Sequence, residues 1–139
     1  MAAASAEQLK MLVRSQLMSE STITDVVGGS IYGAHLQDPD ARTVPYPMVV
    51  LDFRAGFANT SSYQSVNMYL WAYSRENSGE ALRLYDLCQA ALQQQVLRKT
   101  GISVAGYVVE EVRPYEGWND NVRAYFARGQ FTVRAAARS

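Results

Sequence analysis

The sequence predicts a single α+β domain over residues 1–139, in which a mainly antiparallel four-stranded sheet packs with two main helices, one N-terminal and one central. Two observations predict this fold. Apolar residues recur at helical spacing near the N-terminus and again after residue 78, whereas two pairs of segments alternate between apolar and polar residues. The predicted order is helix, strand, strand, helix, strand, strand. Adjacent strand pairs separated by a helix favour antiparallel pairing within one core.

The first helix is predicted near the N-terminus. Ser5 and Gln8 have the spacing of a capping box, which satisfies free backbone N–H groups at a helix start. The apolar residues that follow form one narrow stripe: Leu9, Leu12, Val13 and Leu17. A short turn of helix is then predicted within STITDVVGGSIYG, residues 21–33. Gly28 and Gly29 end it, because glycine adopts the positive φ of a helix C-cap at little cost.

Two strands are predicted after a polar loop over residues 35–44. From Met48, apolar and polar residues alternate as in a strand. Pro45 and Pro47 come just before it, and proline fixes φ at about −65° while restricting the residue that precedes it. The loop therefore enters the strand with little conformational choice. The second strand covers residues 63–75; both of its faces are apolar or aromatic, which predicts a central place in the sheet.

A long central helix is predicted over residues 79–98. Asn77 and Glu80 have capping-box spacing, an apolar stripe follows, and Gly101 ends the segment.

Two further strands are predicted over residues 102–115 and 121–137. The connection between them, PYEGWNDN at residues 114–121, is predicted to be an exposed loop. Pro114 and Gly117 interrupt the strand pattern there, and both residue types are typical of turns.

The composition argues against several classes of protein. Thirteen basic residues balance thirteen acidic ones, so no overall field attracts nucleic acid or an anionic membrane. No apolar run approaches the roughly 18 residues that a membrane-spanning helix needs, and the N-terminus lacks the features of a signal peptide. We therefore expect a soluble protein, made in a cytoplasm, with no membrane partner.

The sequence offers no convincing catalytic, cofactor or metal site. Cys88, the single cysteine, falls on or near the apolar stripe of the central helix and is expected to pack in the core. His35, which two aspartates follow closely, does not have a metal-ligand spacing and is better explained by a solvated turn. Glu110 and Glu111 are adjacent on a strand, so they point to opposite faces and cannot act as an acid–base pair. We expect no enzyme activity and no cofactor.

Aromatic and arginine residues are more informative. Tyrosine and tryptophan concentrate in the predicted strands and in the 114–121 loop. Aromatic residues with a polar tip suit surfaces that are packed on one side and wet on the other, including protein interfaces. Tyr115 and Trp118 either fold back over the sheet edge or contact another molecule. Arginines outnumber acidic residues toward the C-terminus and are either a solvated face or a surface toward phosphate or an acidic partner: Arg113, Arg123, Arg128, Arg134 and Arg138.

The order and lengths of these segments resemble those of one known family. An N-terminal helix and ITDVVGGSIYG lead through a polar loop into VPYPMVVLDF. The strand and helix of VNMYLWAYSRENSGEALRLYDLCQAAL come next, and the strands GYVVEEVRPY and VRAYFARGQFTVRA close the chain. This arrangement resembles the tail-terminator, or tail-completion, proteins of long-tailed bacteriophages and related gene-transfer particles. The resemblance spans almost the whole chain and rests on segment order rather than on a catalytic signature.

The resemblance implies a structural subunit of the virion neck. Such proteins assemble as a ring, typically a hexamer, on the last ring of the tail tube, where they stop tube polymerisation and present a docking surface to the head-completion or connector proteins. DNA passes through the ring without sequence-specific binding. The protein would be made in the bacterial cytoplasm of the host and would end in the virion.

If the chain is such a subunit, its candidate anchors for a subunit or tube interface are aromatic residues. They lie in or beside three predicted loops: 34–44, 56–63 and 114–121. A ring subunit needs a different patch on each side, and buried aromatic anchors often dominate interface energy. Two arginines near the C-terminus are candidates for ion pairs with the next subunit or the tube. The full candidate set is Tyr46, Phe57, Tyr63, Tyr115, Trp118, Arg123 and Arg128.

Two alternatives are open at this point. The chain can be a head-closure, connector or tube-like protein of the same particle, which would share the partners without the stopping role. It can also be a small-ligand-binding or hydrolytic α+β domain, with the aromatic face of residues 69–73 lining a pocket and Asn67 as its polar group. Membrane binding has no basic amphipathic helix to support it.

Overall fold

The computed structural model describes residues 6–33, 45–54, 63–99 and 104–137. Its helices are α1 (Ala6–Met18), α2 (Ser21–Val27) and α4 (Ser78–Leu92). Its strands are β1 (Ile31–Tyr32), β2 (Met48–Arg54), β3 (Tyr63–Ser74), β4 (Val96–Leu97), β5 (Val104–Asn119) and β6 (Ala124–Ala137). None of the helices in these ranges is long and apolar enough to cross a membrane.

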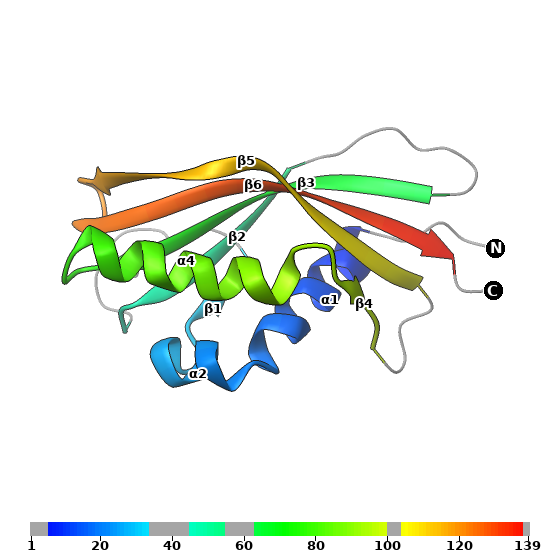
Figure 1. Cartoon of the computed structure of the whole chain (residues 1–139), viewed down its shortest axis with the longest axis horizontal. Helices are drawn as coiled ribbons and strands as arrows, with labels where there is room; N and C mark the ends of the chain where they lie inside the picture. The colour runs from blue at the N-terminus through cyan, green and yellow to red at the C-terminus, as the bar shows by residue number, and fades with distance from the viewer. Residues whose placement is uncertain (1–5, 34–44, 55–62, 100–103, 138–139) are drawn as a thin grey trace.

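The sheet is larger than predicted. Its six strands in the described residues follow the order β1-β2-β3-β6-β5-β4. β1 runs parallel to β2 and the other neighbours are antiparallel, so the sheet is mixed. Three helices pack on one side of it (Figure 1). The prediction of a mainly antiparallel four-stranded sheet packed with two main helices is therefore wrong in its numbers of strands and helices, although the fold is α+β.

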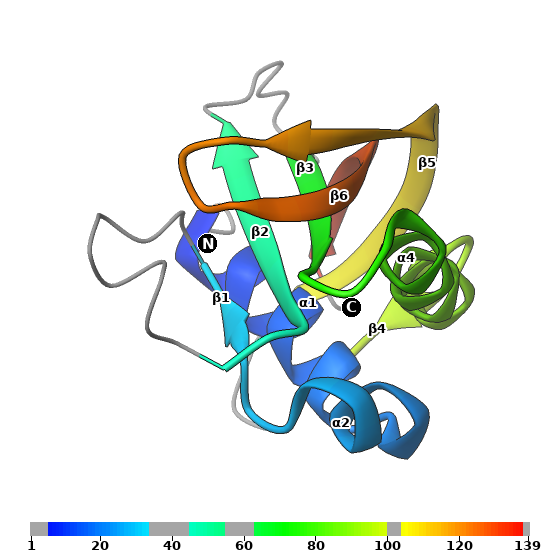
Figure 2. The same cartoon turned by 90° about the vertical axis from the view of Figure 1, so that its left-hand side faces the viewer.

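The strands that the sequence did not predict are the two shortest ones. β1 and β4 contain two residues each, which is too short for an alternating pattern to be recognised. Both lie at the edges of the sheet, where tertiary contacts place them. The sheet curls around α1, with β1 on one side and β4 on the other (Figure 2). Arg14 of α1 reaches β1, because its Nε donates to the Ile31 carbonyl at 3.1 Å.

The N-terminal predictions agree with the structure. The stripe of α1 is buried, and these side chains pack in the core between the helices and the sheet: Leu9, Leu12, Val13 and Leu17. α2 ends where predicted, because Gly28 caps it with a φ of 61° and donates its N–H to the Thr24 carbonyl at 2.8 Å. The proposed cap at Ser5 lies outside the described residues.

The central helix begins as predicted and ends earlier. Asn77 caps α4 by accepting the Glu80 N–H at 2.7 Å. The prediction that the helix reaches residue 98 is wrong, because α4 ends at Leu92. Gln94 has a φ of 58° and donates its N–H to the Val108 carbonyl of β5 at 2.8 Å. After Leu92 the backbone therefore bonds to β5 instead of continuing the helix, and residues 96–97 form β4.

The prediction of an exposed loop over residues 114–121 is wrong for most of this segment, although Tyr115 and Trp118 are exposed. β5 continues through this segment to Asn119, and the turn to β6 covers residues 120–123. Register shifts between Glu110 and Val112 and between Val112 and Tyr115 accommodate Pro114, which cannot donate a backbone hydrogen bond to a neighbouring strand. Irregular pairing thus keeps one long strand where the sequence suggests a break.

The main core lies between the three helices and the sheet. β3 is central, as predicted, with β2 and β6 as its neighbours, and it buries Val66, Met68, Leu70 and Ala72 on the helix side. Tyr85 of α4 packs against this side and donates its hydroxyl to the Glu110 carboxylate at 2.5 Å. A second, smaller core lies on the other side of the sheet: Met48, Val50, Tyr73, Val122, Ala124 and Phe126.

Candidate functional site

The sheet face opposite the helices carries the most distinctive group of side chains. We call it the outer face and define it by residues that alternate with those of the main core: Met48, Val50 and Asp52 of β2; Tyr69, Trp71 and Tyr73 of β3; Phe126, Arg128 and Gln130 of β6; and Val112 and Tyr115 of β5. None of the described helices contributes to the core on this face.

Strand register places these side chains in rows that cross the sheet. One row runs from Val50 to Trp71, then to Arg128, and ends at Tyr115. Directly opposed side chains on one face lie close enough to pack, and aromatic pairs are among the more stabilising ones. The register therefore brings residues from four strands together, although they are far apart in the sequence.

Part of the outer face is closed by the second core. Tyr73 is fully buried, and Phe126 and Trp71 pack beside it, with ring centroids 6.3 Å and 5.8 Å from that of Tyr73. Tyr46 packs on the edge of this core, and the Arg75 guanidinium lies 4.0 Å from the centre of the Tyr46 ring. The peptide bond between Tyr46 and Pro47 is cis.

The hydroxyl of Tyr73 lies inside this closed region. Burial raises the pKa of Tyr73 to about 12, and a hydrogen bond from the Asn119 side chain, at 3.3 Å, acts in the opposite direction. The phenol is therefore neutral across the physiological range and serves packing rather than proton transfer.

The rest of the outer face is open and centres on Arg128. Its guanidinium carbon lies 4.6 Å from the centroid of the Tyr115 ring and 5.0 Å from those of Tyr69 and Trp71. Cation–π contacts with three rings hold the guanidinium in place. Tyr115 is about half exposed (48%), and so is Val112 (50%). This open part, the Arg128 patch, combines aromatic, apolar and cationic groups.

The end of β5, next to the turn into β6, carries a second exposed aromatic group. Trp118 is 50% exposed and packs edge-on against Tyr125, with ring centroids 4.8 Å apart. Its indole Nε1 donates to the Asp120 carboxylate at 3.4 Å. Trp118 alternates with Gly117, so it points to the opposite side of the sheet from Phe126 and the Arg128 patch. Arg123, with a φ of 54°, is exposed in the same turn.

The structure separates the predicted interface residues into groups. Tyr115 and Arg128 are in contact in the Arg128 patch, Trp118 and Arg123 lie at the β5–β6 turn, and Tyr46 covers the second core. Phe57 lies outside the described residues, as do the 34–44 loop and residues 56–62. Tyr63 begins β3, and its backbone pairs with that of Ala136. As candidate anchors of a subunit or tube interface, all seven stay predictions.

Sequence reasoning missed several members of these groups. The alternation in β3 predicts Tyr69 and Trp71 on a covered or ligand-binding face, and no sequence pattern singles out Val112 or Tyr125. The signal was present in β6, where Phe126 and Arg128 alternate with small residues that face the helices. This alternation indicates a shared aromatic and cationic surface only once the strand register shows which residues of β3 and β5 lie opposite Phe126 and Arg128.

The side chains that could act as a nucleophile, an acid or base, or a metal ligand do not gather into one site in the described residues. Cys88 is fully buried, as predicted, and burial raises the pKa of its thiol to about 12. Glu110 accepts the Tyr85 hydroxyl, whereas Glu111 is exposed. No cluster of three metal-ligating side chains occurs in the described ranges, and His35 lies outside them.

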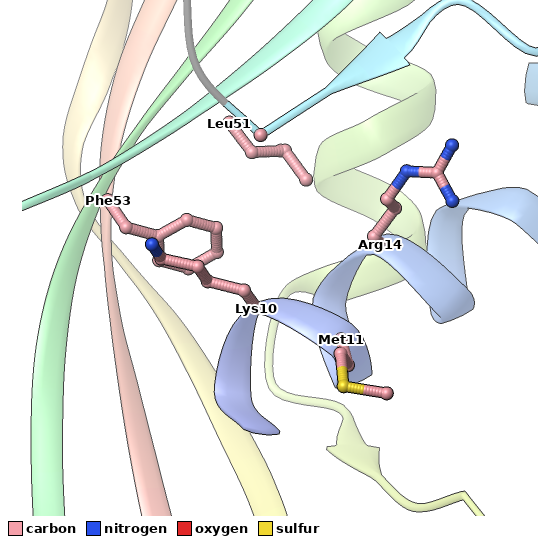
Figure 3. Close-up of a pocket in the computed structure, with 6 residues that line it drawn as sticks. Lys10, Met11, Arg14, Leu51 and Phe53 are labelled. Atoms are coloured by element: carbon pink, nitrogen blue, oxygen red, sulfur yellow. The ribbon is translucent and has the colours of Figure 1, made fainter. Parts of the chain in front are cut away.

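A cleft of about 300 Å³ lies on the helix side, between α1 and the edge of β2. Lys10, Met11 and Arg14 line it from α1, and Leu51 and Phe53 line it from β2 (Figure 3). The Lys10 ammonium lies 5.7 Å from the centre of the Phe53 ring. Arg14 is already engaged with the Ile31 carbonyl, so the polar groups of this cleft support the packing of α1 on the sheet edge.

Comparison with known proteins gives a match of fold. No family model and no curated protein matches the sequence. Seven chains of solved structures match. One is a chain of the virion of a native gene transfer agent particle, with a TM-score of 0.69 and 18% sequence identity. The match covers 98% of this chain and 100% of that chain. The two chains therefore share a fold along their whole lengths.

Proposed function

We propose that this protein is a structural subunit of a phage-like particle, located in the neck of the virion. In this proposal it forms a ring, a hexamer by analogy with tail-terminator proteins, on the end of the tail tube. The ring ends tube polymerisation and offers a surface to the head-completion or connector protein. DNA passes through the ring without sequence-specific contacts. The role needs neither enzyme chemistry nor a cofactor, and it places synthesis in the cytoplasm of a bacterial host.

The observation that carries the proposal is the fold likeness to a virion chain. It covers 98% of this chain and the whole of the other one, so it is not the likeness of one common motif. The segment order resembles the tail-terminator family independently of that comparison. The two together support a particle component, and the resemblance supports the terminator role within the particle.

The arrangement of exposed side chains suits a ring. Head-to-tail contacts require two different patches on each subunit, pointing in different directions. The Arg128 patch lies on the outer face, whereas Trp118 at the β5–β6 turn points to the other side of the sheet. Both contain aromatic and arginine residues, which are enriched at the centres of protein interfaces.

Electron microscopy of the purified protein, alone and mixed with tail tubes of its own particle, tests this proposal. We expect a ring of subunits at one end of each tube, with a mass that fits a hexamer. Bare tube ends at saturating protein would contradict the terminator role. A protein that ignores tubes and binds the head-side connector would instead be a head-closure protein.

A further inference from the structure

Arg128 lies on an inner strand of the sheet, enclosed by aromatic rings. Its own strand, β6, lies between β3 and β5, and the register places Trp71 and Tyr115 directly opposite it on either side. Tyr69 completes a three-ring enclosure, with each ring centroid within 5.0 Å of the guanidinium carbon. The cation is therefore held in one place before any partner arrives, which reduces the entropy lost when it binds.

The guanidinium retains its capacity to bind an anion. Its contacts in the described part of the chain are with ring faces, and no described carboxylate forms an ion pair with it. Ring faces use the charge of the guanidinium but not its five N–H donors, which match a carboxylate or phosphate in a fork geometry. The patch thus combines a positioned cation with hydrogen-bond donors that no residue of the described ranges occupies.

The surroundings of Arg128 limit what can bind there. A depression of about 90 Å³ lies beside it, lined by Tyr69, Val112, Tyr115 and Gln130. Pockets for drug-sized molecules are about 300 Å³ or larger, so this one accepts a single side-chain-sized group. The half-exposed Val112 and Tyr115 at its rim favour an apolar neighbour next to the anionic group.

Charge decides between a carboxylate and a nucleic-acid phosphate. Proteins that bind nucleic acid carry a clear basic excess, whereas this chain has a net charge of zero and Asp52 lies on the same face as Arg128. Tyrosine, tryptophan and arginine together are the residues that dominate protein–protein interfaces. The balance favours an acidic side chain of a protein over a DNA phosphate.

From these observations we infer that the Arg128 patch is a docking site for an aspartate or glutamate side chain of another protein chain, presented beside apolar residues. The inference goes beyond the proposed role on the tail tube, because it names a recognition chemistry that holds for any oligomeric state. It is tested on the isolated protein, so its failure leaves the tube experiment unaffected.

The test uses a library of displayed dodecapeptides selected on the immobilised wild-type protein. Binding of the best peptide is then measured by fluorescence anisotropy, together with its Glu→Gln or Asp→Asn version. We expect selected peptides to share an acidic residue flanked by apolar ones. Arg128→Leu and the amide peptide should each weaken binding by about tenfold or more, since truncating a central interface residue commonly costs that much.

Arg134→Leu is the matched control, because Arg134 is an exposed arginine on the same strand and face and should change binding less than twofold. Thermal unfolding of each variant shows whether it is folded, and Arg128→Lys, which keeps the charge without the fork, should fall between wild type and Arg128→Leu. Peptides without an acidic residue, or equal binding by wild type and Arg128→Leu, would overturn the inference. Tighter Arg128-dependent binding of a single-stranded or duplex oligonucleotide would also overturn it, in favour of a phosphate site.

Discussion

Tyr85 of α4 lies against Gly129 of β6 so closely that the space for a Gly129 side chain is filled by the tyrosine. A Cβ atom built on Gly129 would be 1.8 Å from the Tyr85 hydroxyl oxygen and 2.5 Å from Cζ. Tyr85 is fully buried, and its hydroxyl donates to the Glu110 carboxylate. This contact joins the central helix to two strands at once, and it requires a residue without a side chain at position 129.

We predict that Gly129→Ala destabilises the protein by about 2 kcal/mol or more, because overpacking a filled core displaces Tyr85 and breaks its bond to Glu110. Urea unfolding measures the change. Gly29→Ala is the control, since a Cβ there meets nothing within 4 Å, and it should change the free energy of unfolding by about 0.5 kcal/mol at most. In a Tyr85→Leu background the Gly129→Ala cost should largely disappear. An undiminished cost in that background would show that the helix contact is not its origin.

The start of α4 depends on one side-chain cap. Replacing Asn77 by alanine removes the acceptor of the Glu80 N–H and should destabilise the protein by about 1 kcal/mol. Asn77→Ser retains a capping oxygen and should stay close to wild type. Thermal unfolding of the two variants side by side makes the comparison. An alanine variant that is as stable as wild type would mean that the cap contributes nothing.

Alkaline pH should lower the free energy of unfolding, because two buried groups hold their protons more tightly in the folded state. The folded state raises the pKa of Tyr73 from 10.0 to about 12 and that of Cys88 from 9.0 to about 12. The folded protein therefore binds these protons more tightly than the unfolded chain does. The free energy of unfolding is unaffected by these groups below pH 9 and falls as the pH rises from about 9 to 12.

Tyr73→Phe isolates one of these two contributions. The variant lacks the phenol proton, so its free energy of unfolding should fall less steeply than that of the wild type between about pH 10 and 12. Urea unfolding at several pH values gives both slopes. Parallel curves for the two proteins would contradict the buried-phenol explanation.

The proposed ring predicts a difference between two exposed apolar residues. Trp118→Asp places a charge at the β5–β6 turn and should reduce capping of tail tubes by about tenfold or more, while the monomer stays folded. Val26→Asp places the same charge on exposed α2, where Val26 is 39% exposed, and should leave capping unchanged. Counting capped tube ends by electron microscopy compares them. Equal capping by both variants would remove the β5–β6 turn from the interface.

The part of the fold that sequence predicts well is the part set by local patterns. The stripe of α1, the glycine that ends α2, the Asn77 cap and the central place of β3 all depend on residues that are close in the sequence. The two-residue strands β1 and β4 carry no pattern of their own. Their pairing depends on backbone bonds to β2 and β5, which only the folded chain brings near.

In the candidate site, too, local sequence indicates the residue types, whereas tertiary pairing decides which of them are in contact. Tyr115 and Arg128 could be named from their residue types, but their contact depends on a register that two irregular pairings shift within β5. Proline and glycine in residues 114–117 suggest a loop, whereas the long hairpin with β6 keeps them in a strand. Trp118 was expected in a loop and instead lies at a strand end, so its direction follows from strand alternation.

Whether this protein ends growth of the tail tube, as we propose, can be measured by following tube polymerisation with and without it. Purified tube protein of the same particle would be assembled in the presence of increasing amounts of the protein, and tube lengths measured by electron microscopy. If the protein is a terminator, growth stops and each stopped tube carries one ring at its end. Tubes that grow to the same lengths at every concentration would contradict it.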